Sequence, residues 1–233
     1  VTAEIIAAAG KLRIIGRAGV GVDNVDVPAA TKRGVLVVNS PEGNTIAAAE
    51  HALALMLSLS RHVPHAHAST MAGGWDRKTY VGNELYKKKL GVVGLGKIGS
   101  HVARVARAMG MEVLAYDPFV SAERAQQMQV RLSSLADLFA AADYVSLHLP
   151  RTPETENLVN AELLRTMKPT ARLVNCARGG IVDEAALAEA VKAGTIAGAA
   201  LDVFAKEPLV ADSPLRSVSE RLILTPHLGA STE

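Results

Sequence analysis

The sequence predicts an α/β fold built on a doubly wound parallel sheet, that is, a sheet covered by helices on both faces. Two observations lead to this prediction: short apolar runs rich in β-branched residues recur between residues 90 and 225, and helical segments separate them. Strands of such a sheet are buried on both faces, so they read as continuous apolar runs. The expected strands are Leu90 to Val93, Val113 to Tyr116, Tyr144 to Leu149, Arg172 to Cys176, Ala199 to Asp202 and Leu222 to Thr225.

Residues 1–42 form a smaller α/β stretch ahead of this sheet. Two strands do not make a stable sheet by themselves. We therefore interpret this stretch as part of a second lobe, and the chain as a piece of a longer protein. The expected elements are a helix from Ala3 to Ala9, a strand from Leu12 to Gly16, a helix from Val27 to Lys32 and a strand from Val35 to Asn39.

The segment 43–89 is expected to connect the two units. Its first part, Thr45 to Arg61, is rich in Ala and Leu and apolar on most faces, which is typical of a helix buried between domains. The part from Arg61 to Lys89 has no strong period and is predicted to be an irregular arm that packs on another subunit. Its histidines lack the i, i+4 spacing of a helical metal site and Pro64 interrupts the segment, so no metal is expected at His62, His65 and His67.

The first strand of the large unit opens into three glycines spaced G-x-G-x-x-G, with an amphipathic helix directly behind them. In a dinucleotide phosphate cradle, Gly94 makes the tight turn, Gly96 lets the backbone approach a pyrophosphate, and Gly99 lets the helix pack closely on the sheet. Glycines are common, so the flanking strand and helix are what favour this interpretation. The alternative is a plain βαβ unit with glycine turns.

An acidic residue follows the second strand, at the position that favours one cofactor. Asp117 lies 23 positions beyond Gly94 and 18 beyond Gly99. In such a unit this carboxylate binds the ribose hydroxyls and repels the extra phosphate of NADP. No basic residue follows directly after Asp117, so NAD is the expected cofactor.

Composition excludes several classes of function. The chain has 233 residues and a net charge of +2 with both signs interspersed, so no nucleic-acid partner is expected. No apolar run approaches about 18 residues and the N-terminus is not signal-like, so neither a membrane span nor secretion is expected. The single cysteine, Cys176, rules out an internal disulfide and is expected to be a buried thiol on a strand. The expected location is cytoplasmic, with an organellar one left open.

Three polar residues follow the ends of predicted strands: Arg178, Glu207 and His227. The carboxyl ends of parallel strands meet at one edge of a sheet, where ligands bind. These residue types suit the oxidation of a 2-hydroxy acid. An arginine binds a carboxylate, a histidine transfers a proton, and an acid orients the histidine. Each residue alone is more often structural; their joint occurrence favours catalysis.

A second glycine-rich turn follows the first strand of the small unit, from Gly16 to Asn24. Its backbone N–H groups at Gly19 to Gly21 could hold a substrate carboxylate, with Arg17 available for a further negative group. An ordinary βα turn is an equally weighted alternative.

Six motifs, in order along nearly the whole chain, resemble the D-isomer-specific 2-hydroxyacid dehydrogenases. Within that family, the combination Asn-Cys-Ala-Arg-Gly-Gly and His-Leu-Gly-Ala-Ser-Thr is more typical of the phosphoglycerate-oxidising members. The motifs span Gly16 to Asp26, Gly94 to Gly99, Asn175 to Glu184, Ala199 to Phe204, Lys206 to Pro208 and Pro226 to Thr232.

The resemblance implies NAD-dependent oxidation of 3-phosphoglycerate to 3-phosphohydroxypyruvate, the first committed step of L-serine biosynthesis, with Arg178, Glu207 and His227 as the catalytic set. Substrate contacts are implied for Arg17, Ala18, Gly19, Val20 and Asn44. With the three cradle glycines, the implied cofactor contacts are Ser40, Lys97, Ile98, Asp117, Leu149, Pro150, Cys176, Ala177, Arg178, Asp202, His227, Gly229 and Ala230.

The resemblance also implies a domain organisation: residues 1–42 as a truncated, flavodoxin-like substrate-binding lobe and residues 43–233 as a Rossmann-like NAD-binding domain. Residues 43–89 then supply the interdomain helix and the arm of a homodimer formed through the NAD-binding domain. Because the lobe is incomplete, we expect NAD binding to persist and turnover of this chain to be weak or lost.

Two alternative functions stay open. One is a related enzyme acting on glyoxylate, hydroxypyruvate or D-lactate, since the Arg, Glu and His set is common to the whole family. The other is an NAD-sensing corepressor of the same fold, which binds peptide motifs.

Overall fold

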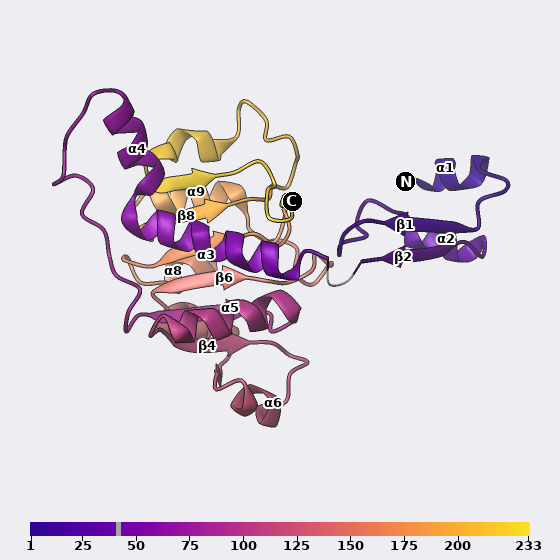
Figure 1. The fold of residues 1–233 in the computed structure, drawn as a ribbon, viewed down its shortest axis with the longest axis horizontal. Helices are drawn as coiled ribbons and strands as arrows, with labels where there is room; N and C mark the ends of the chain where they lie inside the picture. The colour runs from indigo at the N-terminus through magenta and orange to yellow at the C-terminus, as the bar shows by residue number, and fades with distance from the viewer. Residues whose placement is uncertain (41–42) are drawn as a thin grey trace.

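The computed structural model describes residues 1–40 and 43–233, which form a seven-stranded parallel sheet and a separate two-stranded one (Figure 1). The large sheet has the order β5-β4-β3-β6-β7-β8-β9, and the small sheet pairs β1 with β2. The strands are β1 (Ile14–Arg17), β2 (Leu36–Asn39), β3 (Lys89–Val93), β4 (Glu112–Tyr116), β5 (Arg131–Leu132), β6 (Tyr144–Leu147), β7 (Arg172–Asn175), β8 (Gly198–Leu201) and β9 (Leu222–Leu224).

All six strands predicted for the large sheet are present, and every neighbouring pair is parallel. The strand predicted from Tyr144 to Leu149 ends at Leu147. The sequence did not predict β5, which is only two residues long and lies at the edge of the sheet. Chain order runs outward in opposite directions from β3 and β6, so the switch point where α/β folds bind ligands lies between these two strands.

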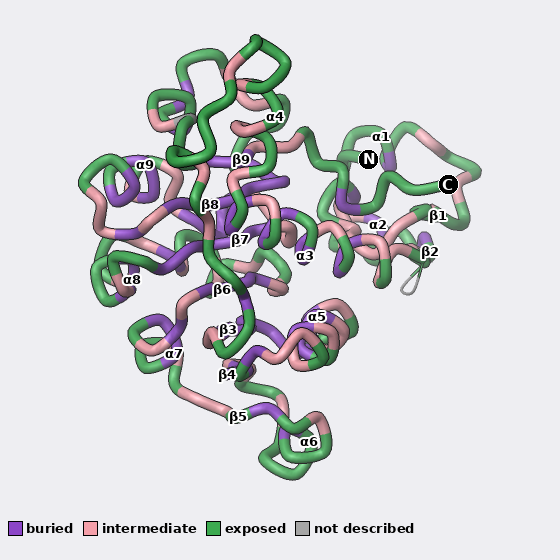
Figure 2. The backbone as a smooth tube through the Cα atoms, turned by 60° about the vertical axis from the view of Figure 1, so that its left-hand side comes forward, coloured by how far each residue is buried: buried purple, intermediate pink, exposed green. Residues whose placement is uncertain are grey.

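Helices cover both faces of the large sheet. Helices α3 and α5 pack on one face, and α7, α8 and α9 on the other. Successive strand residues enter opposite cores: Val92 faces the first and Val93 the second, which explains the continuous apolar runs. The central strands β6, β7 and β8 are buried along their whole length (Figure 2). The helices are α1 (Ala3–Ala8), α2 (Val27–Lys32), α3 (Thr45–Arg61), α4 (Val63–Met71), α5 (Lys97–Ala108), α6 (Ala122–Gln127), α7 (Leu135–Ala141), α8 (Ala161–Thr166), α9 (Glu184–Lys192) and the 3₁₀ segment η1 (Pro214–Arg221).

The segment 43–89 holds one confirmed and one wrong prediction. Helix α3 and its burial were predicted from its composition, and its buried residues, between Ala48 and Ser60, pack against the sheet; its place between two domains stays a prediction. The expectation of a wholly irregular arm was wrong, because α4 begins directly after His62, which adopts a left-handed conformation. Pro64 lies in the first turn of α4, where a missing N–H group breaks no hydrogen bond.

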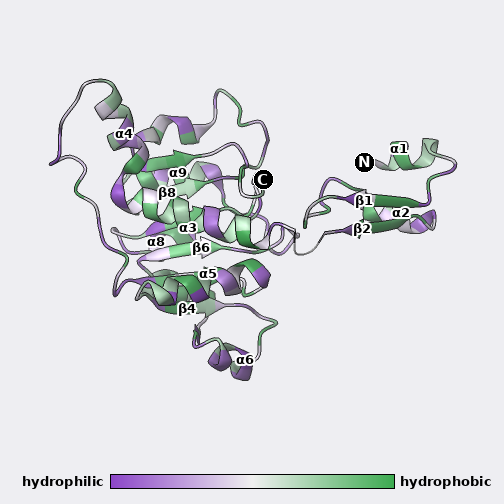
Figure 3. Ribbon diagram, in the orientation of Figure 1, coloured by the Kyte–Doolittle hydropathy of each residue, from purple (hydrophilic) through white to green (hydrophobic). Residues whose placement is uncertain are grey.

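The small unit packs α1 and α2 on its two strands around Ile6, Ala30 and Val35. It projects from the body that contains the large sheet, and its strands carry apolar side chains (Figures 1 and 3). The predicted boundary at 42/43 falls at residues 41–42, outside the described residues, and remains a prediction. Among the described residues, none of the helices has the length and hydropathy needed to cross a bilayer.

Candidate functional site

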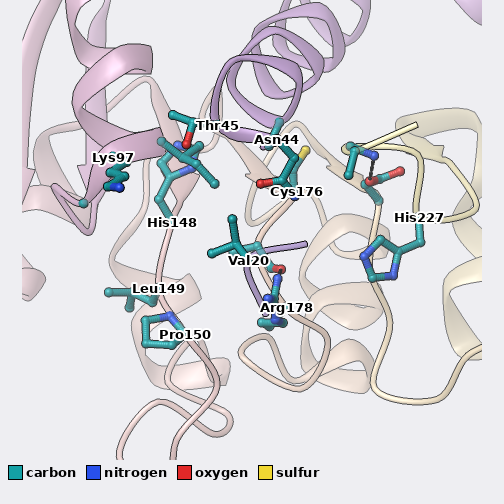
Figure 4. Close-up of a pocket in the computed structure, with 17 residues that line it drawn as sticks. Val20, Asn44, Thr45, Lys97, His148, Leu149, Pro150, Cys176, Arg178 and His227 are labelled. Carbon is teal, nitrogen blue, oxygen red and sulfur yellow. Dashed lines mark hydrogen bonds between the residues drawn. The ribbon is translucent and has the colours of Figure 1, made fainter. Parts of the chain in front are cut away.

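A cavity of about 340 Å³ opens at the carboxyl ends of the central strands, beside the switch point (Figure 4). It receives residues from the glycine loop, from the loops after β6, β7, β8 and β9, and from the small unit through Val20. Of the predicted cofactor contacts, those that line it are Gly96, Lys97, Ile98, Leu149, Pro150, Cys176, Ala177, Arg178, Asp202, His227, Gly229 and Ala230.

A second cavity, of about 640 Å³, adjoins the first on the side of the small unit. Arg178, His227 and Ala230 line both cavities, and Glu207 lines the second. All five predicted substrate contacts line the second cavity: Arg17, Ala18, Gly19, Val20 and Asn44. Ser40, Gly94, Gly99 and Asp117 line neither.

The glycine loop joins β3 to the N-terminus of α5. Gly94 has φ +96°, in the region that favours glycine, and a Cβ on Gly99 would lie 1.9 Å from the carbonyl oxygen of Gly94. A Cβ on Gly96 would meet no atom within 4 Å, so the open space lies over this glycine alone. A helix N-terminus with open space in front of it suits an anion such as a pyrophosphate.

Asp117 lies at the end of β4, next to the same loop. One carboxylate oxygen accepts a hydrogen bond from the N–H of Leu95 at 2.7 Å, and the other from the N–H of Phe119 at 2.9 Å. These two bonds fix the carboxylate beside the glycine loop while each oxygen keeps a lone pair for a further donor.

Glu207 and His227 form a hydrogen-bonded pair. Oε2 of Glu207 lies 2.8 Å from Nδ1 of His227, and Oε1 accepts from the N–H of Phe204 at 3.0 Å. The carboxylate therefore orients the ring, and Nε2 is left for a reacting group. The imidazole, half exposed, points toward the centre of the site, where Arg178 also lies (Figure 4).

Asp202 is fully buried at the floor of the first cavity. Its carboxylate accepts hydrogen bonds from the Thr225 hydroxyl at 2.6 Å and from the N–H groups of Leu228 and Gly229, both at 2.8 Å, and lies 3.2 Å from Nε2 of His51. The loop that carries His227 is thus tied to β8. The sequence analysis missed His51 and Thr225, although a histidine at this end of an otherwise apolar helix was a usable signal.

Two buried polar atoms in the cavity wall have no hydrogen-bond partner within the described part of the protein. Among the described residues, Asn44 Oδ1 and Thr45 Oγ1 are buried without a hydrogen-bond partner, and both line the first cavity. Buried polar atoms are nearly always bonded, so these atoms point to a polar ligand. Together with the open space over Gly96, they make the cavity suitable for a dinucleotide.

Two titratable groups in the wall are held neutral by burial. Burial raises the pKa of the Cys176 thiol far above its usual range, and the nearby Asp202 carboxylate adds to this effect. Cys176 lies one residue beyond β7, not on the strand as predicted. Burial lowers the pKa of His148 to about 4, and its Nε2 lies 2.9 Å from the Ser146 hydroxyl. His148, which the sequence analysis did not single out, is therefore an uncharged wall residue at neutral pH.

Dinucleotide-dependent dehydrogenases use this arrangement: a parallel sheet with a glycine loop, an acid and a Glu–His pair near its switch point. Residues 53–229 match the family described as D-isomer specific 2-hydroxyacid dehydrogenase, NAD binding domain. The chain belongs to this family.

Comparisons with individual proteins agree with this assignment. Over the whole chain, it is 65% identical to a D-3-phosphoglycerate dehydrogenase of Synechocystis and 54% identical to one of Archaeoglobus fulgidus, covering 42% and 44% of those proteins. The chain thus spans less than half the length of these relatives. A solved structure of a D-lactate dehydrogenase from Aquifex aeolicus, complexed with NAD and lactic acid, is 31% identical with a TM-score of 0.91, covering all of this chain and 74% of that one.

Proposed function

We propose that the protein oxidises 3-phosphoglycerate to 3-phosphohydroxypyruvate with NAD, as the first committed step of L-serine biosynthesis. The observation that carries this proposal is the meeting of Arg178 and His227 where the two cavities join. A substrate in the second cavity would meet a cofactor in the first at this junction. The name shared by the Synechocystis and Archaeoglobus relatives supports the choice of substrate.

We assign cofactor binding to the first cavity and its surroundings. The N-terminus of α5 would hold the pyrophosphate, Asp117 would accept hydrogen bonds from a ribose, and Asn44 and Thr45 would gain hydrogen-bond partners. Bound NAD supplies the acceptor for the hydride that leaves the substrate carbon bearing the hydroxyl group. The neutral states of Cys176 and His148 keep further charge out of the wall around it.

The chain's own residues handle the charge and the proton. Nε2 of His227 accepts the proton of the substrate hydroxyl, and Glu207 holds the ring through Nδ1 and stabilises the imidazolium that results. Arg178 binds the substrate carboxylate and polarises the oxygen on the reacting carbon. In the reverse direction, His227 returns the proton.

The phosphate end of the substrate fits the far part of the second cavity. Arg17 lies there with the glycine turn of the small unit, and Arg151, which the sequence analysis did not single out, lines the same cavity. Arg151 forms an ion pair with Glu156 at 2.6 Å, so it would have to share its charge between this carboxylate and a bound phosphate. We therefore assign residues 1–42 to substrate binding and residues 43–233 to NAD binding.

An assay of NADH production by the full-length protein tests the proposal. Turnover should be highest with 3-phosphoglycerate, lower with D-glycerate, which lacks the phosphate, and lowest with D-lactate. The variant Arg17→Gln should lose activity toward 3-phosphoglycerate while keeping its activity toward D-glycerate. Reduction of NAD by D-lactate alone would instead assign the protein to the lactate-oxidising branch of the family.

The homodimer and the cytoplasmic location also belong to this proposal. The segment that contains α4 exposes large apolar side chains, with Met71 74%, Trp75 83% and Val81 73% exposed. A second copy of the chain would cover them, since monomers rarely expose extended apolar patches. Fractionation of the native cells would check the location.

A further inference from the structure

Arg178 is held by a carboxylate from the other unit of the chain. Its Nε donates to Oδ2 of Asp23 at 2.6 Å, across 155 residues of sequence, and its Nη1 donates to the carbonyl oxygen of Ala177 at 2.7 Å. Two bonds from two different nitrogens fix the rotation of a planar guanidinium group. The described residues give Nη2 no hydrogen-bond partner.

The same guanidinium group lies against the backbone of Gly21. A Cβ on Gly21 would be 1.8 Å from Nη2 of Arg178 and 3.0 Å from Oδ2 of Asp23. A side chain at this position would force the guanidinium group to move, so glycine is what leaves the pair in its observed geometry. The glycine turn of the small unit thus supplies both the acceptor for Arg178 and the flat surface that it rests on.

The ion pair is too exposed to serve mainly for stability. The Asp23 side chain is 55% exposed and the Arg178 side chain 30%, and ion pairs at such positions contribute little to folding. Asp23 also places a negative charge in the cavity that receives an anionic substrate, which disfavours binding unless it brings another benefit. The hydrogen bond from Nε of Arg178 to Asp23 supplies such a benefit, because it fixes the orientation of the Arg178 guanidinium group.

We propose that Asp23 is a positioning residue: by occupying Nε of Arg178, it turns the Nη1 and Nη2 edge toward the junction of the two cavities, where the substrate carboxylate binds. This inference rests on the proposed role of Arg178 as the carboxylate-binding residue. Asp23 acts through Arg178 and does not touch the reacting atoms. The Arg178 fork is then already aligned before the substrate arrives, which lowers the entropic cost of binding.

The first test compares Asp23→Ala, Asp23→Asn and Asp26→Asn in the full-length protein. Loss of a charge-assisted hydrogen bond predicts that Asp23→Ala lowers kcat/KM for the hydroxy acid about tenfold or more, with KM for NAD unchanged. Asp23→Asn, which keeps an acceptor for Nε, should recover part of the loss. Asp26 caps α2 from the same loop and lines neither cavity, so Asp26→Asn should behave as wild type. An equal loss in Asp26→Asn would show general loop damage and overturn the proposal.

A double-mutant cycle tests whether Asp23 acts through Arg178. Lysine ends in a single amine and has no planar guanidinium group that Asp23 could orient. Asp23→Ala should therefore change kcat/KM less than twofold in an Arg178→Lys background. The same tenfold loss in both backgrounds would contradict the proposal. Gly21→Ala supplies an independent route, since its methyl group displaces the guanidinium without removing any charge, and it should reproduce the loss at an unchanged melting temperature.

Calorimetric titration with oxalate separates this inference from the proposed function. Oxalate presents a carboxylate without being oxidised, so its affinity for the NAD-loaded protein reports on the Arg178 fork whichever hydroxy acid is the substrate. Asp23→Ala should weaken oxalate binding about tenfold. An unchanged oxalate affinity would overturn the positioning role. Failure of the wild type to oxidise 3-phosphoglycerate, with this effect intact, would overturn only the substrate assignment.

Discussion

At the scale of single residues, the Glu207–His227 pair separates proton transfer from cofactor binding. Nδ1 of His227 is hydrogen-bonded to Glu207 and the ring lies between the two cavities, so the group that we propose to move the proton is oriented before any ligand binds. We expect cofactor affinity to depend mainly on other groups: the glycine loop and the N-terminal end of α3 at the first cavity, and Asp117 beside the glycine loop.

His227→Ala should therefore abolish turnover and leave NAD binding nearly unchanged. Removal of a general acid–base group predicts a loss in kcat of roughly 10² to 10⁴-fold. Steady-state kinetics and a fluorescence titration with NADH measure the two quantities separately. His67→Ala, on the exposed side of α4, is the matched control. Normal turnover in His227→Ala would remove His227 from the mechanism.

Neutral His148 gives the folded protein a specific sensitivity to acid. Its pKa in the folded state is about 4, against an ordinary value of 6.5. Between these values the unfolded chain binds a proton that the folded protein does not, so the free energy of unfolding falls as the pH falls. At pH 5 the loss amounts to about 2 kcal/mol.

Chemical denaturation of wild type and His148→Asn at pH 7 and pH 5 checks this expectation. The variant can keep a hydrogen bond to Ser146 and cannot take up the proton, so its stability should fall less between the two pH values. The quantity to compare is the change in the free energy of unfolding between pH 7 and pH 5, since the substitution also changes packing and thus the stability at any single pH. His67→Gln should retain the wild-type pH dependence, and a wild-type slope in His148→Asn would contradict the assigned cause.

At the scale of elements, two glycines of the same loop, three residues apart, have different roles: Gly99 allows close packing of α5, and Gly96 leaves space for a ligand. A methyl group at position 99 meets the backbone of Gly94, whereas one at position 96 enters open space. Gly99→Ala should destabilise the fold by about 1 to 3 kcal/mol, the usual cost of overpacking. Gly96→Ala should leave the melting temperature unchanged and weaken NAD binding about tenfold or more, because the methyl group takes the place of the pyrophosphate.

Thermal melts and NADH titrations of both variants test this pair. If Gly96→Ala binds NAD as tightly as wild type, the pyrophosphate does not lie over this glycine. If Gly99→Ala melts as wild type does, the close approach of α5 to the loop is not a constraint on the fold.

Local patterns predicted most of the elements and grouped the three residues that we propose as the catalytic set. Strands buried on both faces read as apolar runs, and a parallel sheet brings the residues after them to one edge, so Arg178, Glu207 and His227 could be grouped without a structure. The short β5 has too few residues to form a pattern. Pro64 was misread because proline is compatible with the first turn of a helix as well as with a break.

Contacts between distant parts of the chain could not be predicted in this way. Asp23 meets Arg178 across 155 residues, and His51 meets Asp202 from a helix on one face of the sheet. Neither pair leaves a periodic signal, because each depends on how whole units pack together. Asp23 and His51 were therefore missed, as were the lining residues Thr45, His148 and Arg151, while most of the predicted contacts do line the two cavities.

At the scale of the whole molecule, the exposed apolar segment after α3 is expected to hold two subunits together. Trp75→Glu places a charge in the proposed interface, and burying an unpaired charge is costly, so the variant should be a monomer where the wild type is a dimer. Light scattering after size exclusion measures the mass of each. Phe119→Glu, at another side chain that is 95% exposed, should leave the dimer intact. A monomeric wild type would contradict the assignment.

The switch point also joins two halves of the sheet that are continuous only through the pairing of β3 with β6. The strands β3 to β5 lie on one side of it and β6 to β9 on the other, so a ligand at this point spans the joint between them. Such a ligand favours the state in which the joint is closed. Amide hydrogen exchange should therefore slow on β3 and β6 together when NAD binds. Such a result would mean that the cofactor stabilises the contact between the two halves of the sheet.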